Sequence, residues 1–121
     1  MNESELIKTL SEYPKLIMEK GSAIWKLKQE HEETKLNLKV FETNTLLAVA
    51  QVKDRNDKPV FSNDLKREAE TERRLSENSS FIALKKRVKE QEIEIVEQQL
   101  GLEFVNNTFG AAKALSKFMG E

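Results

Sequence analysis

The 121-residue sequence contains no cysteine, two prolines, four glycines and one histidine. Without cysteine it has no disulfide, thiolate metal site or cysteine nucleophile, and it fits a reducing compartment. His31 has no second histidine or cysteine with which to complete an ordinary metal or nucleophile site. We therefore expect no metal, no cofactor and no enzymatic activity, and interpret His31 as a polar residue that sets register between helices.

Long apolar runs are also missing. The longest run, Leu46 to Ala50, is far too short to span a bilayer, and the acidic start of the chain lacks the basic and apolar parts of a signal peptide. No glycine-rich phosphate loop is present. The sequence therefore predicts a cytoplasmic protein with no membrane partner and no nucleotide hydrolysis.

The residues that fill the chain favour helices. Charged residues make up 34% and hydrophobic residues 38% of the sequence, a mixture more charged and less apolar than an ordinary globule contains. Glu, Lys, Leu, Gln and Arg lose little rotamer freedom in a helix. We predict an all-α fold, namely an elongated helical hairpin or bundle with two long helices and one or two short ones.

Local signals divide the single predicted domain, residues 1–121, into helices and one turn. Proline disfavours helix at the residue before it, so a break is expected at Tyr13. The segment Asp54–Pro59 is a strong turn signal, Ser62 or Asn63 can cap a following helix, and residues 77–80 indicate a kink or a second N-cap. The predicted segments are a short helix (3–12), a long helix (14–53), a turn (54–62), a short helix (63–76) and a long helix (80–119).

Apolar residues recur at alternating steps of three and four along both long helices, the spacing of a coiled-coil seam. We expect Trp25, at the edge of the first seam, to complete the core rather than to protrude. The sequence leaves open whether the seams close within one chain or between chains. The first seam comprises Ile24, Leu27, His31, Thr34, Leu38, Phe41, Thr45, Ala48 and Val52, and the second Phe81, Leu84, Val88, Gln91, Ile95, Gln98, Leu102, Val105, Phe109, Ala112, Ser116 and Met119.

A further apolar stripe lies in the middle of the last helix and consists of Ile93, Val96, Leu100 and Phe104. One hairpin of this length cannot cover both seams and this stripe. We therefore predict a homo-oligomer that has these four residues in its interface.

Charge is distributed unevenly along the chain. Residues 53–89 carry eleven Lys and Arg against seven Asp and Glu, a net charge of +4, whereas residues 90–121 carry −4. If the long helices pair antiparallel, the basic segment gathers at the hairpin end, where it can attract phosphates or an acidic partner. The alternative is an ordinary solvated helix face. The nucleic-acid-binding residues that we predict are Lys66, Arg67, Arg73, Arg74, Lys85, Lys86, Arg87 and Lys89.

The order of these segments resembles that of the UvsY-type recombination mediators of phages. The resemblance covers roughly residues 14–119: an early tryptophan within Ala23–Leu27, a polar charged loop, a Lys/Arg/Glu helix with a Leu-Ser step over Lys66–Ser76, and a last helix with apolar and Gly/Ala residues over Leu102–Leu115. It implies a homo-oligomer in a bacterial host cell that binds single-stranded DNA and helps to load a recombinase on DNA covered by single-strand-binding protein. The chain departs from this pattern in being acidic overall.

Two hypotheses follow. The first is a non-catalytic, phage-type accessory protein of DNA recombination or replication that binds single-stranded DNA through the basic hairpin end, with salt-sensitive and sequence-tolerant affinity. The alternative is a helical scaffold or inhibitor that binds a protein partner through its helix faces and binds no nucleic acid.

Overall fold

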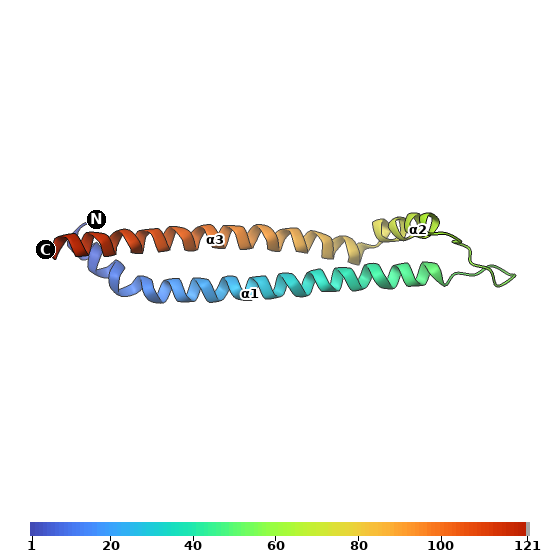
Figure 1. Cartoon of the computed structure of the whole chain (residues 1–121), viewed down its shortest axis with the longest axis horizontal. Coiled ribbons are helices and arrows are strands. Elements are labelled where there is room, and N and C mark those ends of the chain that lie inside the picture. The colour runs from blue at the N-terminus through green and yellow to red at the C-terminus, as the bar shows by residue number, and fades with distance from the viewer. Residues whose placement is uncertain (121) are drawn as a thin grey trace. The chain divides into compact units, whose positions relative to one another are not determined.

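A computed structural model describes residues 1–120 and contains three helices (Figure 1): α1 (Glu3–Ala50), α2 (Asp64–Glu77) and α3 (Ser79–Met119). Within these residues the only β-type pairing is an isolated bridge between Lys53 and Pro59. The predicted all-α fold, with two long helices and a short one, is confirmed. Glu121, which was counted in the predicted domain and in the acidic C-terminal segment, lies outside the described residues. Within residues 1–120, no helix combines the length and the apolar character needed to cross a membrane.

The chain folds as two compact units. Unit 1 combines Met1–Glu30 with the segment that begins at Gln91, and unit 2 comprises His31–Glu90. In unit 1 the first part of α1 and the last part of α3 run antiparallel, and both termini lie at the same end (Figure 1). Unit 2 contains the last part of α1, the turn, α2 and the first turns of α3.

α1 continues through Pro14, so the predicted break at Tyr13 is wrong. Proline lacks the N–H that would donate to the carbonyl of Leu10, and one helical hydrogen bond is lost. Packing keeps the preceding turns helical, because Leu6 and Thr9 bury their side chains and the Thr9 hydroxyl donates to the Glu5 carbonyl at 2.8 Å. The blue start of α1 is bent against the part that follows (Figure 1), as a proline in a helix requires.

The core of unit 1 is a narrow seam between α1 and α3. Its buried hydrophobic residues are Leu6, Ile24, Ile95, Val105 and Ala112. The last four were predicted seam positions. Two other predicted positions, Gln98 and Met119, are exposed. The glutamine amide keeps its hydrogen bonds with water there, which an apolar seam would remove, and Met119 is the last residue of α3.

Trp25 is 63% exposed, so its predicted place in the core is wrong. The neighbouring Ile24 is buried, and the next residue of a helix lies about 100° further round the axis, which turns the indole outward.

In unit 2 the aromatic rings of Phe41 and Phe81 pack at 5.9 Å between centroids, and Val49 is fully buried. The prediction of Ala48 in this seam is wrong, because Ala48 is exposed and the inward-facing positions step from the partly buried Phe41 and Thr45 by four residues each to the buried Val49. Two successive steps of four shift the seam by one residue and bring the larger side chain inside.

Local capping begins and ends the helices of unit 2. Asn63 is the N-cap of α2, its Oδ1 accepting from the backbone N–H of Lys66 at 2.8 Å, as predicted. Asn78 ends α2 and also accepts from the backbone N–H of Phe81 at 3.1 Å, which confirms the predicted second N-cap. In the preceding turn, Asp54 Oδ1 accepts from the N–H of Asn56 at 2.8 Å and Lys58 at 3.0 Å.

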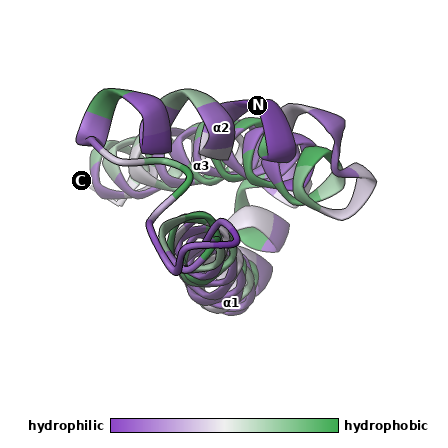
Figure 2. Cartoon of the chain, turned by 90° about the vertical axis from the view of Figure 1, so that its right-hand side faces the viewer, coloured by the Kyte–Doolittle hydropathy of each residue, from purple (hydrophilic) through white to green (hydrophobic). Residues whose placement is uncertain are grey.

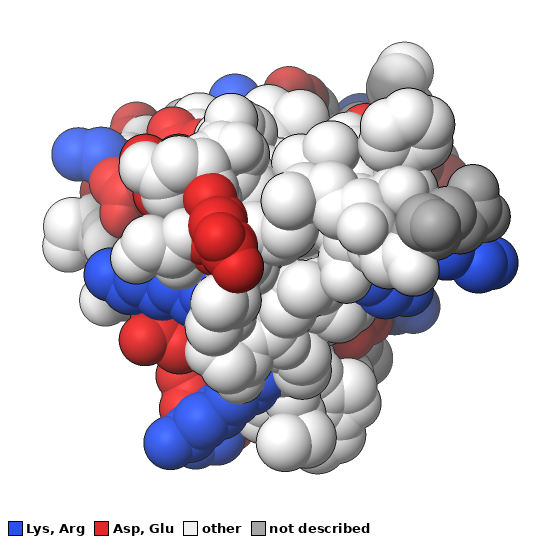
Figure 3. Space-filling view, turned by 90° about the vertical axis from the view of Figure 1, so that its left-hand side faces the viewer, with Lys and Arg blue, Asp and Glu red and all other residues white. Residues whose placement is uncertain are grey.

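Hydrophobic residues are not confined to the facing sides of the helices. Green, hydrophobic segments alternate with purple, hydrophilic ones along both α1 and α3 (Figure 2). The end of unit 1 that carries the termini presents mostly uncharged side chains, with an acidic side chain near the middle of the view and other charged residues toward the edges (Figure 3). Over the described residues only seven hydrophobic side chains are buried. Much apolar surface is therefore left on the outside of the helices.

Candidate nucleic-acid interface

All eight predicted nucleic-acid-binding residues lie in unit 2. Four belong to α2 and four to the first turns of α3. Residues 31–90 carry thirteen Lys and Arg against eleven Asp and Glu, a net charge of +2, whereas the rest of the chain carries −3. The basic character predicted for residues 53–89 is thus diluted by acids such as Glu32, Glu33 and Glu42 of the same unit.

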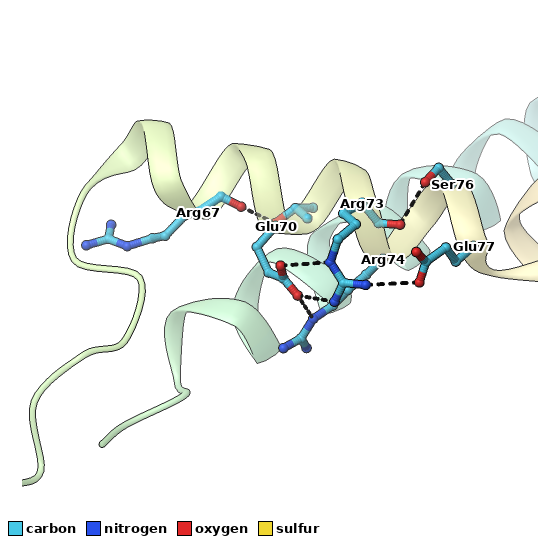
Figure 4. Close-up of polar contacts among 7 residues, drawn as sticks. Arg67, Glu70, Arg73, Arg74, Ser76 and Glu77 are labelled. Atoms are coloured by element: carbon cyan, nitrogen blue, oxygen red, sulfur yellow. Dashed lines mark hydrogen bonds and ion pairs between the residues drawn. The ribbon is translucent and has the colours of Figure 1, made fainter. Parts of the chain in front are cut away.

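Two arginines of α2, Arg73 and Arg74, are bound by carboxylates of the same helix (Figure 4). Arg73 donates to both oxygens of Glu70 at 3.0 and 2.6 Å, and Arg74 donates to Glu70 Oε1 at 3.0 Å. Arg73 also reaches Glu77 at 3.0 Å. Hydrogen bonds from Arg73 and then Arg74 lower the pKa of Glu70 from its ordinary value of 4.5 to about 2. Both guanidinium groups are therefore paired with carboxylates of α2, although the Arg73 side chain is still 56% exposed.

Arg67 also has a structural contact. Its Nε donates to the carbonyl of Phe61 at 3.1 Å and its Nη1 lies 3.2 Å from the Asp64 carboxylate. The side chain therefore fastens the segment before α2 to the first turn of that helix. Lys66, by contrast, forms no ion pair within the described part of the chain.

The basic residues of α3 are held much more loosely. Lys86 and Arg87 each lie 3.9 Å from the Glu90 carboxylate, at the limit of an ion pair, and Lys89 has no ion-pair partner among residues 1–120. Lys85 places its Nζ 5.9 Å from the centre of the Phe81 ring. These cations stay solvated, and exposed pairs of this kind contribute little.

Three of these cations share one helix face. Lys85, Lys86 and Lys89 surround the half-exposed Ile82 and line a shallow hollow of about 260 Å³, which we call the lysine patch. Arg87 projects from a different side, because each residue turns the helix by about 100°. The structure thus brings together three of the four α3 residues and separates Arg87 from them.

Beside the lysine patch, α1, α2 and α3 enclose a groove of about 540 Å³. Leu46, Leu75 and Phe81 contribute its apolar lining, while Glu68 and Lys85 are among the charged residues around it. Sequence reasoning missed this groove because its walls come from three separated segments. Within residues 1–120, no group of three or more His, Asp or Glu is placed to hold a metal ion.

The predicted oligomer residues lie in unit 1 and are all exposed. Ile93, Val96, Leu100 and Phe104 are exposed by 60, 53, 61 and 70%. No helix of unit 1 covers them, so they are available to another chain, and the interface itself stays a prediction.

No family model, curated protein or solved structure matches this chain. The functional argument therefore depends on the chemistry of the lysine patch, the groove and the exposed apolar residues.

Glu70→Gln is expected to make α2 less stable at neutral pH and less sensitive to acid. A carboxyl group whose folded pKa is lowered stabilises the fold above its unfolded pKa, near 4.5, and this contribution is lost as pH falls toward about 2. Circular dichroism between pH 7 and about 2 should show a helical loss in the wild type that is smaller in Glu70→Gln. Glu72→Gln is the control, since Glu72 has no ion pair within the described residues. Equal acid profiles for the wild type and Glu70→Gln would contradict the assignment.

Proposed function

We propose that this chain is a non-catalytic, phage-type accessory protein of DNA recombination or replication that binds single-stranded DNA through unit 2. In keeping with the family that its sequence resembles, it would act beside a recombinase or a single-strand-binding protein. The observation that carries the DNA-binding part is the lysine patch, in which three cations share one exposed face of α3 and are at most weakly paired.

The chemistry of the lysine patch suits a phosphate backbone. Lysine ammonium groups neutralise phosphates without reading base edges, so binding should depend on salt and tolerate sequence changes. Ile82, which is 50% exposed among the lysines, offers an apolar contact to a base or sugar. Arg73 and Arg74 are tied to Glu70, so we assign them to the support of α2 and place the DNA contact on α3.

Fluorescence anisotropy with a labelled single-stranded oligonucleotide tests the proposal. Three lysine contacts should give a log affinity that falls with log salt at a slope of about −2, since each phosphate contact contributes about −0.7. Random and homopolymeric sequences should bind with similar affinity. An absence of salt-sensitive binding at low ionic strength would rule out this function.

A helical scaffold that binds a protein partner is the second candidate. The chain exposes 9124 Å² of surface, against about 6,700 Å² expected for a folded monomer of its mass. The excess contains many large apolar residues. The groove of unit 2, lined by the exposed Leu46 together with Leu75 and Phe81, offers an apolar surface to an amphipathic helix. Failure to bind DNA, together with burial of these residues in a complex with another protein, would favour this candidate.

A further inference from the structure

Unit 1 carries two exposed apolar stripes, one on each of its helices. The α3 stripe consists of Ile93, Val96, Leu100 and Phe104. The α1 stripe consists of Ile7, Met18 and Trp25, which are exposed by 60, 70 and 63%. Large side chains exposed to this extent mark a surface that a partner covers.

Both stripes point away from the seam that closes unit 1. On α1, Ile24 is buried in that seam and Trp25 lies about 100° further round the helix. On α3, Ile95 is buried in the seam, whereas its sequence neighbours Ile93 and Val96 are exposed. Burial of Ile24 and Ile95 thus uses one side of each helix and leaves the stripes on the other. Neither stripe can be covered by its own hairpin.

The two stripes match in spacing. Met18 and Trp25 are one heptad apart, as are Ile93 and Leu100. This interval returns a residue to nearly the same side of a helix, so the Met18–Trp25 part of the α1 stripe, which follows the bend at Pro14, can pack along the α3 stripe over about two turns.

The charges beside the Met18–Trp25 part of the α1 stripe are opposite to those beside the α3 stripe, whereas residues 3–12 around Ile7 contain three glutamates and one lysine. Residues 15–28, around Met18 and Trp25, contain four lysines and one glutamate. Residues 91–112, around the α3 stripe, contain four glutamates and neither lysine nor arginine. Packing α3 on α3 would oppose glutamates, and packing α1 on α1 would oppose lysines. Packing α1 on α3 brings opposite charges together, which favours this pairing over the other two.

We propose that the α3 stripe of one copy of this chain packs against the α1 stripe of a second copy. A two-fold dimer satisfies this pairing, because its two copies can make the contact reciprocally, and so does a closed ring in which each copy meets one neighbour through each stripe. This inference concerns unit 1 and does not rest on DNA binding by unit 2.

The only tryptophan, Trp25, reports on the contact directly. As the concentration of the wild type rises into the tens of micromolar, its emission should shift to shorter wavelength because the indole leaves water. Leu100→Asp on α3 should abolish this shift and weaken self-association about tenfold or more, since it places a charge in an apolar contact. Asn106→Asp adds the same charge to α3 outside the stripe and should keep the wild-type shift.

Charge reversal tests which stripe meets which. One variant carries Glu97→Lys and Glu103→Lys beside the α3 stripe, and the other carries Lys15→Glu and Lys26→Glu beside the α1 stripe. Each variant alone should lose self-association in sedimentation velocity. An equimolar mixture of the two should regain it, as should a single chain with all four changes. Wild-type helicity by circular dichroism in each variant separates loss of contact from loss of fold.

Three results would overturn the proposal. The first is self-association of the wild type with Trp25 still in a water-like environment, which would place the contact elsewhere. The second is an equimolar mixture that fails to recover while both variants remain helical. The third is a wild type that stays monomeric at tens of micromolar. The proposal also fails in this way if the α3 stripe of the monomer binds a lysine-rich helix of another protein instead of a second copy. None of these results depends on whether DNA binds.

Discussion

Replacing Lys85, Lys86 and Lys89 together by glutamine is expected to weaken the binding of single-stranded DNA and to flatten its dependence on salt. These lysines form the lysine patch, where ion pairs are weak or absent. Each lost phosphate contact lowers the magnitude of the slope of log affinity against log salt by about 0.7. Three contacts account for roughly a 20-fold change in affinity across a fourfold change in salt. Anisotropy titrations at several salt concentrations measure this directly.

Two controls make the result specific. Changing Lys8, Lys15 and Lys117 of unit 1 to glutamine removes the same charge and should alter the slope much less. Adding Arg87→Gln to the patch variant should have little further effect, because Arg87 projects from another side of α3 and lies 3.9 Å from Glu90. Equal losses from the patch and from unit 1 would mean that binding follows total charge, and the lysine patch would then not be the site.

The features that sequence predicted well are those decided by neighbouring residues. Asn63 and Asn78 cap helices because a short amide side chain reaches backbone N–H groups two or three residues ahead. The turn after α1 follows from Asp54, whose carboxylate accepts from Asn56 and Lys58. The two long seams follow from helical periodicity, which needs no knowledge of the partner helix.

The features that sequence missed depend on contacts between distant segments. The helix survives Pro14 because Leu6 and Thr9 are buried on its N-terminal side, which a local rule for proline does not include. Val49 replaces Ala48 in the seam because the seam shifts by one residue near the end of α1. The groove was not predictable, because its walls come together only when three helices pack.

For the candidate site, the sequence located the basic residues but did not show which of them are paired with carboxylates. Arg73 and Lys85 look equivalent in a charge count. In the structure Arg73 is bound to Glu70 and Glu77, whereas Lys85 stands beside an aromatic ring on the lysine patch. The difference comes from carboxylates placed three and four residues away, a helical spacing that favours ion pairs. The same spacing also gives Lys86 and Arg87 a carboxylate in Glu90, so pairing charges by interval alone distinguishes Arg73 from Lys85 but does not separate α2 from α3.

Phe81→Ala is expected to cause the largest loss of stability in unit 2. Phe81 is only 6% exposed, packs on Phe41 at 5.9 Å between ring centroids, and begins the buried face of α3. Among the described residues of this unit, Val49 is the only other buried hydrophobic side chain. Truncating a buried phenylalanine costs about 3–5 kcal/mol, a large part of the 5–15 kcal/mol that stabilises a typical domain. Thermal unfolding followed by circular dichroism should therefore shift by at least about 10 °C.

The adjacent Ile82 provides a matched control for this prediction. It lies in the same turn of α3 but is 50% exposed, so Ile82→Ala should cost less than about 1 kcal/mol. Combining Phe81→Ala with Phe41→Ala tests the aromatic pair itself, because residues in contact should show a coupling of about 1 kcal/mol rather than additive losses. Similar small shifts for Phe81→Ala and Ile82→Ala would mean that the Phe41–Phe81 contact does not hold α1 and α3 together in unit 2. Unit 2 would then be stabilised chiefly by its caps and by the ion pairs of α2, and Glu70→Gln would become the more damaging substitution.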